Sequence, residues 1–155
     1  MPATKVETKT LARIATIAGN IGGITAARVS TGLVPWSDTA NWEAAVKALT
    51  AESQGYFWCA LKAVPCVKRG VQHNLEFYAE LVVPLAKETS TSMITAWEFA
   101  LSLRDALELT SNYSAGEMPV SVSVGLRCAR PIKSGWLAIF DFGGHGDGQM
   151  TAVDP

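Results

Sequence analysis

The sequence has few charged residues. They make up 17% of its 155 residues, whereas an average globular protein has about 25%. The 13 basic and 14 acidic residues leave a net charge of −1, and the only adjacent basic pair is Lys68–Arg69. This scatter excludes the concentrated cationic face on which phosphate-driven binding of nucleic acids depends. The shortage of charge leaves two alternatives open: an apolar area that faces another subunit, or a monomer whose surface is rich in Ser and Thr.

The sequence also lacks a cysteine framework. Its three cysteines, Cys59, Cys66 and Cys128, are odd in number and include no Cys-x-x-Cys pair. This pattern excludes a disulfide framework and a structural zinc site. Because each cysteine falls in an apolar stretch, we predict reduced, buried thiols that behave as small hydrophobes.

Long apolar runs are missing as well. No stretch approaches the roughly 20 residues that a membrane-spanning helix needs. The polar segment 4–10 does not resemble a signal peptide. We therefore expect an intracellular-type protein without a membrane partner.

The length of the chain fits a single domain, and we find neither a repeat of fixed period nor a linker that divides it. We predict one domain over residues 1–142. Residues 143–155 contain four glycines and few apolar residues. This composition predicts a flexible Gly-rich C-terminal tail.

Three stretches place apolar residues at helical spacing, at residues 10–18, 39–51 and 90–109. The last is the strongest, because its apolar stripe lies opposite Glu98 and Asp105. The stripe consists of Met93, Ala96, Ala100, Leu103 and Leu107.

Four other stretches are typical of strands, at residues 56–64, 74–83, 120–128 and 136–142. Apolar and polar residues alternate in the second and third, and the others are rich in strand-forming residues. Turn signals join the first two strands and the last two, which predicts two hairpins. The sequence thus predicts an α+β fold, with a mostly antiparallel four-stranded sheet and helices packed on one face.

The segment 141–148 is the most tempting candidate for chemistry, because His145 lies between Asp141 and Asp147. Asp141–Gly143 also copies a short kinase motif, but the other kinase motifs are absent. A phosphate-binding loop would need a helix after the glycines, and no helical pattern follows. We interpret the segment as a solvated loop.

The remaining polar residues form no recognisable catalytic set. Glu76 and Glu80 share one strand face about 13 Å apart, farther than the carboxylate pairs of glycosidases. His73 has no ligand partner at a suitable spacing, and no Gly-x-Ser-x-Gly motif is present. We predict no catalytic, cofactor-binding or metal-binding residues, and therefore no enzyme.

From about Gly55 to Phe142, the chain resembles the tail terminator (tail-completion) proteins of long-tailed bacteriophages. The likeness rests on the order of elements and on local sequence. An N-terminal helix precedes a long hairpin whose second strand ends in residues 78–86, and a helix carrying Ala96–Trp97 and a strand pair over 120–142 follow. Size and near-neutral charge also agree.

The resemblance implies a homohexameric ring that caps the growing tail tube, stops its polymerisation and joins it to the head-side connector. The partners would be other copies of the chain, the tail tube protein and the head–tail connector protein. DNA would pass through the ring without specific binding, and no cofactor is implied. Such a protein is assembled in the host cytoplasm and is located in the tail or neck of the virion.

The resemblance also suggests roles for individual residues. Sheet edges and the hairpin turn near Lys68 and Arg69 would meet adjacent subunits, with Arg127 as a further interface candidate. Trp36, beside a proline, is a candidate aromatic anchor in a neighbouring subunit. Glu76 and Glu80 would line the channel, because an acidic wall avoids trapping DNA.

Two alternatives stay open. One is another phage neck or head–tail connector component. The other, from a different class, is a small-molecule-binding or catalytic domain that uses the remaining sheet face as a pocket, which would be a monomer or dimer.

Overall fold

The computed structural model describes residues 5–21, 24, 29–31, 55–61, 67–69, 72–85, 90–132 and 135–149. Within them the helices are α1 (Val6–Gly19), α3 (Ser90–Glu108) and the short 3-10 helix η3 (Thr110–Asn112). The strands are β1 (Val29–Thr31), β2 (Tyr56–Leu61), β3 (Val67–Arg69), β4 (Gln72–Leu85), β5 (Ser121–Ile132) and β6 (Gly135–Gln149). The helix predicted over 39–51 lies outside the described residues.

The strands form one sheet in the order β1-β2-β4-β6-β5, with β3 paired to β4. All pairs are antiparallel except β1 with β2. The four strands predicted from the sequence are β2, β4, β5 and β6. The predicted α+β fold with a mostly antiparallel sheet is therefore confirmed, and the three-residue strands β1 and β3 extend it.

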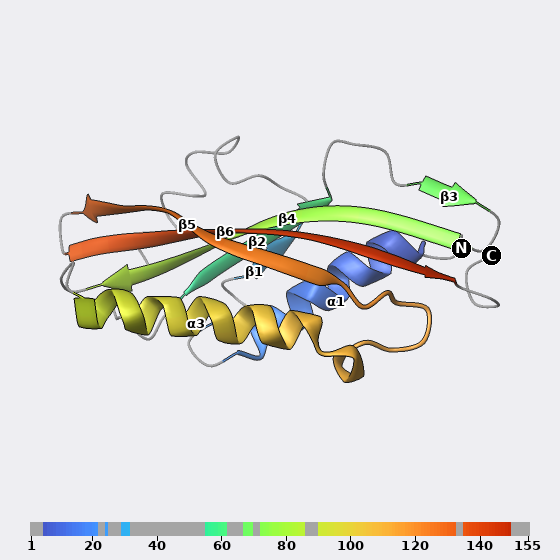
Figure 1. Ribbon diagram of the computed structural model, residues 1–155, viewed down its shortest axis with the longest axis horizontal. Helices are drawn as coiled ribbons and strands as arrows, with labels where there is room; N and C mark the ends of the chain where they lie inside the picture. The colour runs from blue at the N-terminus through green and yellow to red at the C-terminus, as the bar shows by residue number, and fades with distance from the viewer. Residues whose placement is uncertain are drawn as a thin grey trace.

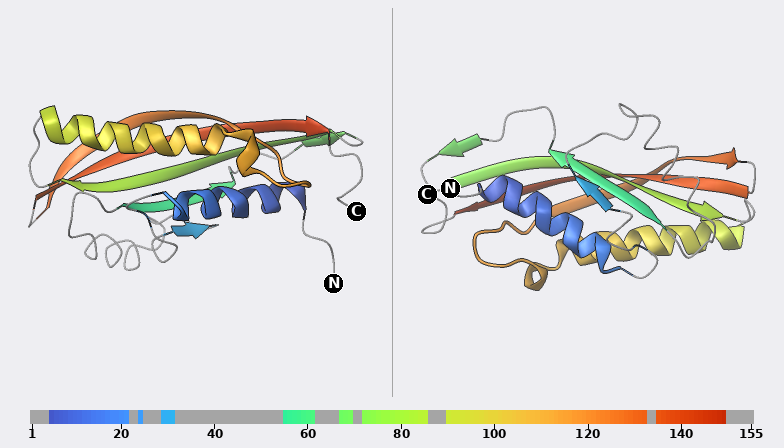
Figure 2. Two further views of the ribbon diagram at one scale, coloured as in Figure 1. Left: turned by 90° about the horizontal axis from the view of Figure 1, so that it is seen from below. Right: turned by 180° about the vertical axis from the view of Figure 1, so that it is seen from behind.

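Both helices lie on the same face of the sheet (Figures 1 and 2). In the view of Figure 1, α3 lies in front, below β5 and β6, and α1 lies behind it, below β2. Alternate residues of β4, such as Leu75, Phe77 and Leu81, point to the helices and are buried. Because successive strand residues point to opposite faces, these residues meet the apolar stripes of both helices in one core.

Helix α1 begins at Val6, earlier than predicted, because this residue belongs to the core. The buried hydroxyl of Thr10 accepts a hydrogen bond of 2.9 Å from the backbone N–H of Met118. Arg13 adds an ion pair of 2.9 Å with Glu117. These contacts tie the N-terminal helix to the segment that leads into β5.

The predicted flexible tail is wrong for residues 143–149. They continue β6 and pair with residues 72–78 of β4, and residues 143–145 also pair with β5. The sequence pattern misses this part of the strand because glycine has no side chain that could alternate between the faces. Residues 150–155 lie outside the described residues.

Gly144 has a specific packing role in this strand. It lies opposite Phe77 in the register of β4 and β6. A Cβ atom at this position would overlap the Phe77 ring and would lie 2.9 Å from the backbone oxygen of Ser121. A glycine therefore makes room for a fully buried aromatic ring between two paired strands.

The thiol of Cys59 is free and buried, as predicted, and burial raises its pKa from 9.0 to about 12. At pH 8 roughly one thiol in ten thousand is ionised at such a pKa. In a Cys66→Ser/Cys128→Ser variant, we expect no measurable alkylation by iodoacetamide at pH 8 until the protein is unfolded. Mass spectrometry of the alkylated product checks this expectation.

The matched control is a variant that keeps only Cys128, which is partly exposed and should react in the native protein. Rapid native labelling of Cys59 would contradict the prediction. The unfolded thiol ionises first as the pH rises. The contribution of Cys59 to stability is therefore fully present below about pH 9 and declines as the pH approaches 12.

Candidate functional site

Three charged residues from three strands meet on the sheet face opposite the helices, called the second face below. Glu80 of β4 lies directly opposite Asp141 of β6, and Arg127 of β5 binds both carboxylates. Its Nη1 lies 2.7 Å from Glu80 Oε2, its Nε donates to Asp141 Oδ2 at 3.0 Å, and its Nη2 donates to Asp141 Oδ1. Two like charges in register repel each other, and the guanidinium compensates for this repulsion.

A β-bulge brings Arg127 to this position. The register of β5 on β6 shifts between Leu126 and Cys128, so that Arg127 is the extra residue. A bulge of this kind changes the direction of a side chain. Hydrogen bonds and charge from Asp141, together with the charge of Glu80, outweigh the opposing effect of burial and raise the pKa of Arg127.

Glu80 is buried, with 1% of its side chain exposed. Its Oε1 also accepts a hydrogen bond of 3.3 Å from the indole N–H of buried Trp58. Trp58 packs edge-on against Tyr78, with ring centroids 5.2 Å apart. Burial and the Glu80 charge raise the pKa of Tyr78, and Arg127 partly opposes this shift.

All three nitrogen atoms of the guanidinium are thus engaged within the chain. The cluster of Glu80, Arg127 and Asp141 can hold three strands and a bulge in register, but it presents no free cationic group to a substrate. Its chemistry is that of a structural clamp.

The clamp changes the interpretation of two predicted site residues. Glu80 was expected to line a channel, and this expectation is wrong because its carboxylate is buried beside Trp58. Arg127, predicted at a subunit interface, is 40% exposed but bound to two carboxylates of its own chain. Glu76 lies on the second face and is exposed, as the alternation predicted.

The other interface candidates are placed only in part. Lys68 and Arg69 belong to β3 and pair with His73 and Gln72 of β4, so the chain reverses its direction between Arg69 and Gln72, near the predicted turn. Their side chains, like Trp36, lie outside what the structure describes.

Both histidines lie in strands. His73 is buried, and its Nδ1 lies 2.7 Å from Glu7 Oε1 of α1, a carboxylate that local spacing could not reveal. His145 is exposed on β6. The interpretation of 141–148 as a solvated loop is therefore wrong, because these residues form part of β6.

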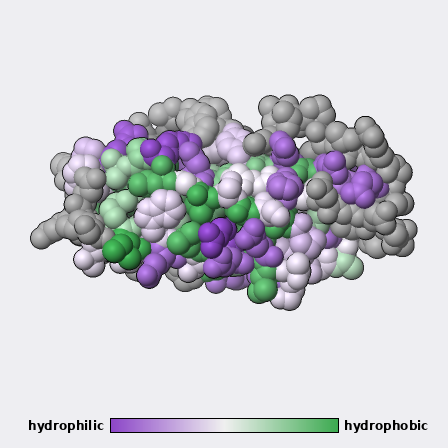
Figure 3. Space-filling model, in the orientation of Figure 1, coloured by the Kyte–Doolittle hydropathy of each residue, from purple (hydrophilic) through white to green (hydrophobic). Residues whose placement is uncertain are grey.

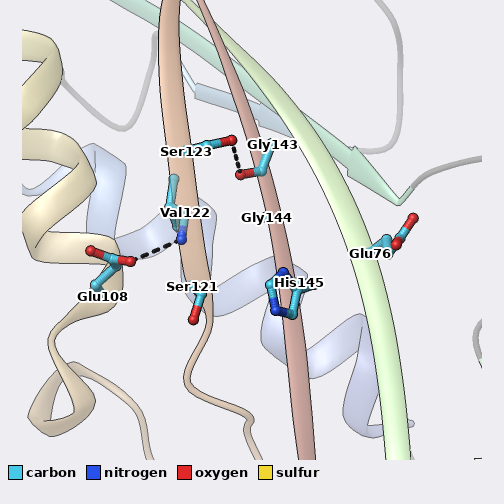
Figure 4. Close-up of a pocket in the computed structure, with 8 residues that line it drawn as sticks. All are labelled: Glu76, Glu108, Ser121, Val122, Ser123, Gly143, Gly144 and His145. Carbon is cyan, nitrogen blue, oxygen red and sulfur yellow. Dashed lines mark hydrogen bonds between the residues drawn. The ribbon is translucent and has the colours of Figure 1, made fainter.

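His145 lines a pocket of about 370 Å³ at the start of β5 (Figure 4). The other polar side chains around it are Glu76, Glu108, Ser121 and Ser123. Ser121, His145 and Glu76 follow one another across three strands in direct register. This order of hydroxyl, imidazole and carboxylate is the one that nucleophilic hydrolases use.

The geometry of the pocket does not support such a relay. In Figure 4 the Ser121 hydroxyl and the Glu76 carboxylate point away from the His145 ring. The hydrogen bonds drawn there run from the Val122 N–H to Glu108, 3.0 Å, and from the Ser123 hydroxyl to the Gly143 carbonyl, 3.2 Å. A nucleophile must lie within hydrogen-bond reach of its base, and Figure 4 shows no such contact between Ser121 and His145.

The described residues contain no group of three or more His, Cys, Asp or Glu side chains that could hold a metal ion. No helix among them is both long enough and apolar enough to cross a membrane.

A scan against protein-family models finds no match to this chain, and a search of the curated proteins finds none either.

Proposed function

We propose that the chain is a tail terminator (tail-completion) protein of a long-tailed bacteriophage. Six copies form a ring that caps the tail tube and joins it to the head-side connector. The observation that carries this proposal is the order and layering of elements: a helix, the β2–β4 hairpin, a long helix and the β5–β6 hairpin, with both helices on one face. The sequence resemblance rests on the same order.

The use of polar side chains also favours a structural role. Glu80, Arg127 and Asp141 hold three strands together, and Glu7 with His73 joins α1 to the sheet. These groups bind each other, and none of them lines the pocket beside His145. The polar chemistry of the described part therefore serves the scaffold.

The mechanism of a cap is steric and thermodynamic. One face of the ring binds the end of the tube in the way that another layer of tube subunits would. The opposite face has no surface to which further tube subunits can bind, so polymerisation stops. Glu76 is the remaining candidate for the channel wall, where its carboxylate would repel DNA in transit. The site of action is the tail or neck of the virion.

The oligomeric state tests this proposal. Native mass spectrometry and negative-stain imaging of the purified chain, alone and with tail tubes, are expected to show six-fold rings, either free or on tube ends. Added chain should also limit tube length. Monomers that ignore tubes would overturn the proposal, and rings that bind only the head–tail connector would indicate a neck component instead.

A further inference from the structure

The two edges of the sheet differ in length. Strand β5, with 12 residues, forms one edge and pairs only with β6 among the described strands. The opposite edge is formed by β1 and β3, with three residues each. A long exposed edge strand is a template for another strand, and proteins usually protect such edges.

One hydrogen bond shows which backbone groups of β5 point away from β6. The N–H of Val122 donates to Glu108 of α3, so this N–H points away from β6. In an antiparallel pair this direction alternates along the strand, so the N–H and C=O groups of Val124 and Leu126 also point outward. Beyond Leu126 the bulge interrupts the pattern. Among the described residues, the outward backbone groups of Val124 and Leu126 therefore have no partner strand, and they lie between the capped Val122 and the bulge.

The stretch itself carries no charged side chain. Residues 121–126 contain no ionisable group, and the charge that follows, Arg127, is bound by the clamp. Leu126 is 36% exposed and Ile94 of α3 is 59% exposed. Figure 3 shows hydrophobic side chains interspersed with hydrophilic ones over α3 and β5, on the side that faces the viewer. The usual protection of an edge by charge is missing here.

We propose that residues 124–126 of β5 pair with β1 of a second copy of this chain. The stretch is as long as β1, and unpaired backbone groups in a row specify an extended strand as the occupant. Strand β1 runs parallel to β2, whereas the pairs β2–β4, β4–β6 and β6–β5 are antiparallel, so β1 and β5 of one copy run in opposite directions. A second copy that lies beside β5 in the same orientation therefore presents its β1 antiparallel to β5.

The absence of charge in the stretch and the net charge of −1 allow two copies to approach without strong repulsion. Pairing of two different edges is a head-to-tail contact, which generates a ring when the rotation closes. This inference rests on the proposed ring and names the contact that builds it. Each contact is small, and ring closure strengthens it because every copy is held on two sides.

The sharpest test is Val124→Pro with Val124→Ala as the matched control. Proline removes an N–H that points outward, so it does not remove a hydrogen bond between β5 and β6. Both variants lose the valine packing, but only the proline variant loses the edge donor. Native mass spectrometry is expected to show self-association weakened at least tenfold for Val124→Pro and nearly unchanged for Val124→Ala, with circular dichroism confirming that both fold.

If Val124→Pro does not fold, Leu126→Lys replaces it. This variant adds a charge at the edge, and Ser123→Lys places the same charge on the second face. The inference predicts weaker self-association for Leu126→Lys alone. Equal self-association of both variants with the wild type would overturn it.

Cross-linking identifies the partner strand. In the Cys66→Ser/Cys128→Ser background, Gly125→Cys and Ser30→Cys variants are mixed and treated with a short bismaleimide. Links between the two variants are expected, whereas links of Gly125→Cys to itself would mean β5–β5 pairing and would overturn the inference.

The outcomes separate the two proposals. Rings that give the mixed link but ignore tail tubes would sustain the contact and overturn the proposed function. Rings that cap tubes without the mixed link would sustain the function and overturn the contact. A chain that is monomeric under all conditions would overturn both.

Discussion

Replacing Arg127 with methionine is expected to lower the free energy of unfolding by about 3 kcal/mol. The change leaves the carboxylate of Glu80, 1% exposed, without its cation and still opposite Asp141 in the register of β4 and β6. Removing one partner of a buried ion pair typically costs about 3–5 kcal/mol. We take the lower end because the Arg127 side chain is 40% exposed. Urea denaturation followed by circular dichroism measures the loss.

The matched control is Arg104→Met, since Arg104 pairs with Asp105 on the exposed side of α3. An exposed pair is worth at most about 1 kcal/mol. In the double variant Arg127→Met/Glu80→Gln, the buried charge is gone while an oxygen remains for the Trp58 N–H, so we expect at least half of the loss to be recovered. Losses of similar size for Arg127→Met and Arg104→Met would contradict the buried clamp.

A Gly144→Ala substitution is expected to destabilise the protein by about 2–3 kcal/mol. The new methyl group would overlap the ring of Phe77 and crowd the backbone oxygen of Ser121. Neither neighbour can move freely, because the ring is fully buried in the core and the oxygen belongs to a paired strand. Overpacking of a well-filled core typically costs about 1–3 kcal/mol. Thermal and urea unfolding report the change.

The adjacent residue supplies the control. At Gly143 the nearest atom to a new Cβ would be the Ser123 hydroxyl oxygen at 3.6 Å, an ordinary contact. Gly143→Ala should therefore change stability by no more than about 0.5 kcal/mol. In Gly144→Ala/Phe77→Leu the two effects should partly cancel, since the smaller side chain relieves the overlap. A loss equal to the sum of the single variants would show that the ring is not the obstacle.

The elements predicted best from the sequence are those whose side chains carry a clear period. Residues 74–83 alternate because one face of β4 contacts the helices and the other does not, and 90–109 is helical because its apolar stripe fits the sheet. The end of β6 could not be predicted in this way. Its glycines carry no pattern, and the strand is defined by its pairing with β4 and β5.

The clamp was beyond the reach of sequence patterns for a similar reason. Alternation placed Glu80 and Arg127 on the polar faces of their strands, but it assigned no face to Asp141 and did not indicate which strands are neighbours. The bulge that directs Arg127 depends on a register shift between β5 and β6, which the alternation of side chains does not reveal. The burial of Glu80 depends on Trp58 and Tyr78. A useful signal was nevertheless present, because these two acidic residues and one basic residue lie in three different predicted strands.

The position of β6 has a consequence for biosynthesis. This strand is made after all the others described, yet it lies between β4 and β5 in the sheet order. On the ribosome, β5 has no neighbour to pair with until β6 has emerged, and the two halves of the sheet cannot join before then. The edge formed by β5 therefore takes its final form only after β6 has been made, and until then the unpaired edges of β4 and β5 leave the nascent chain open to pairing with other chains.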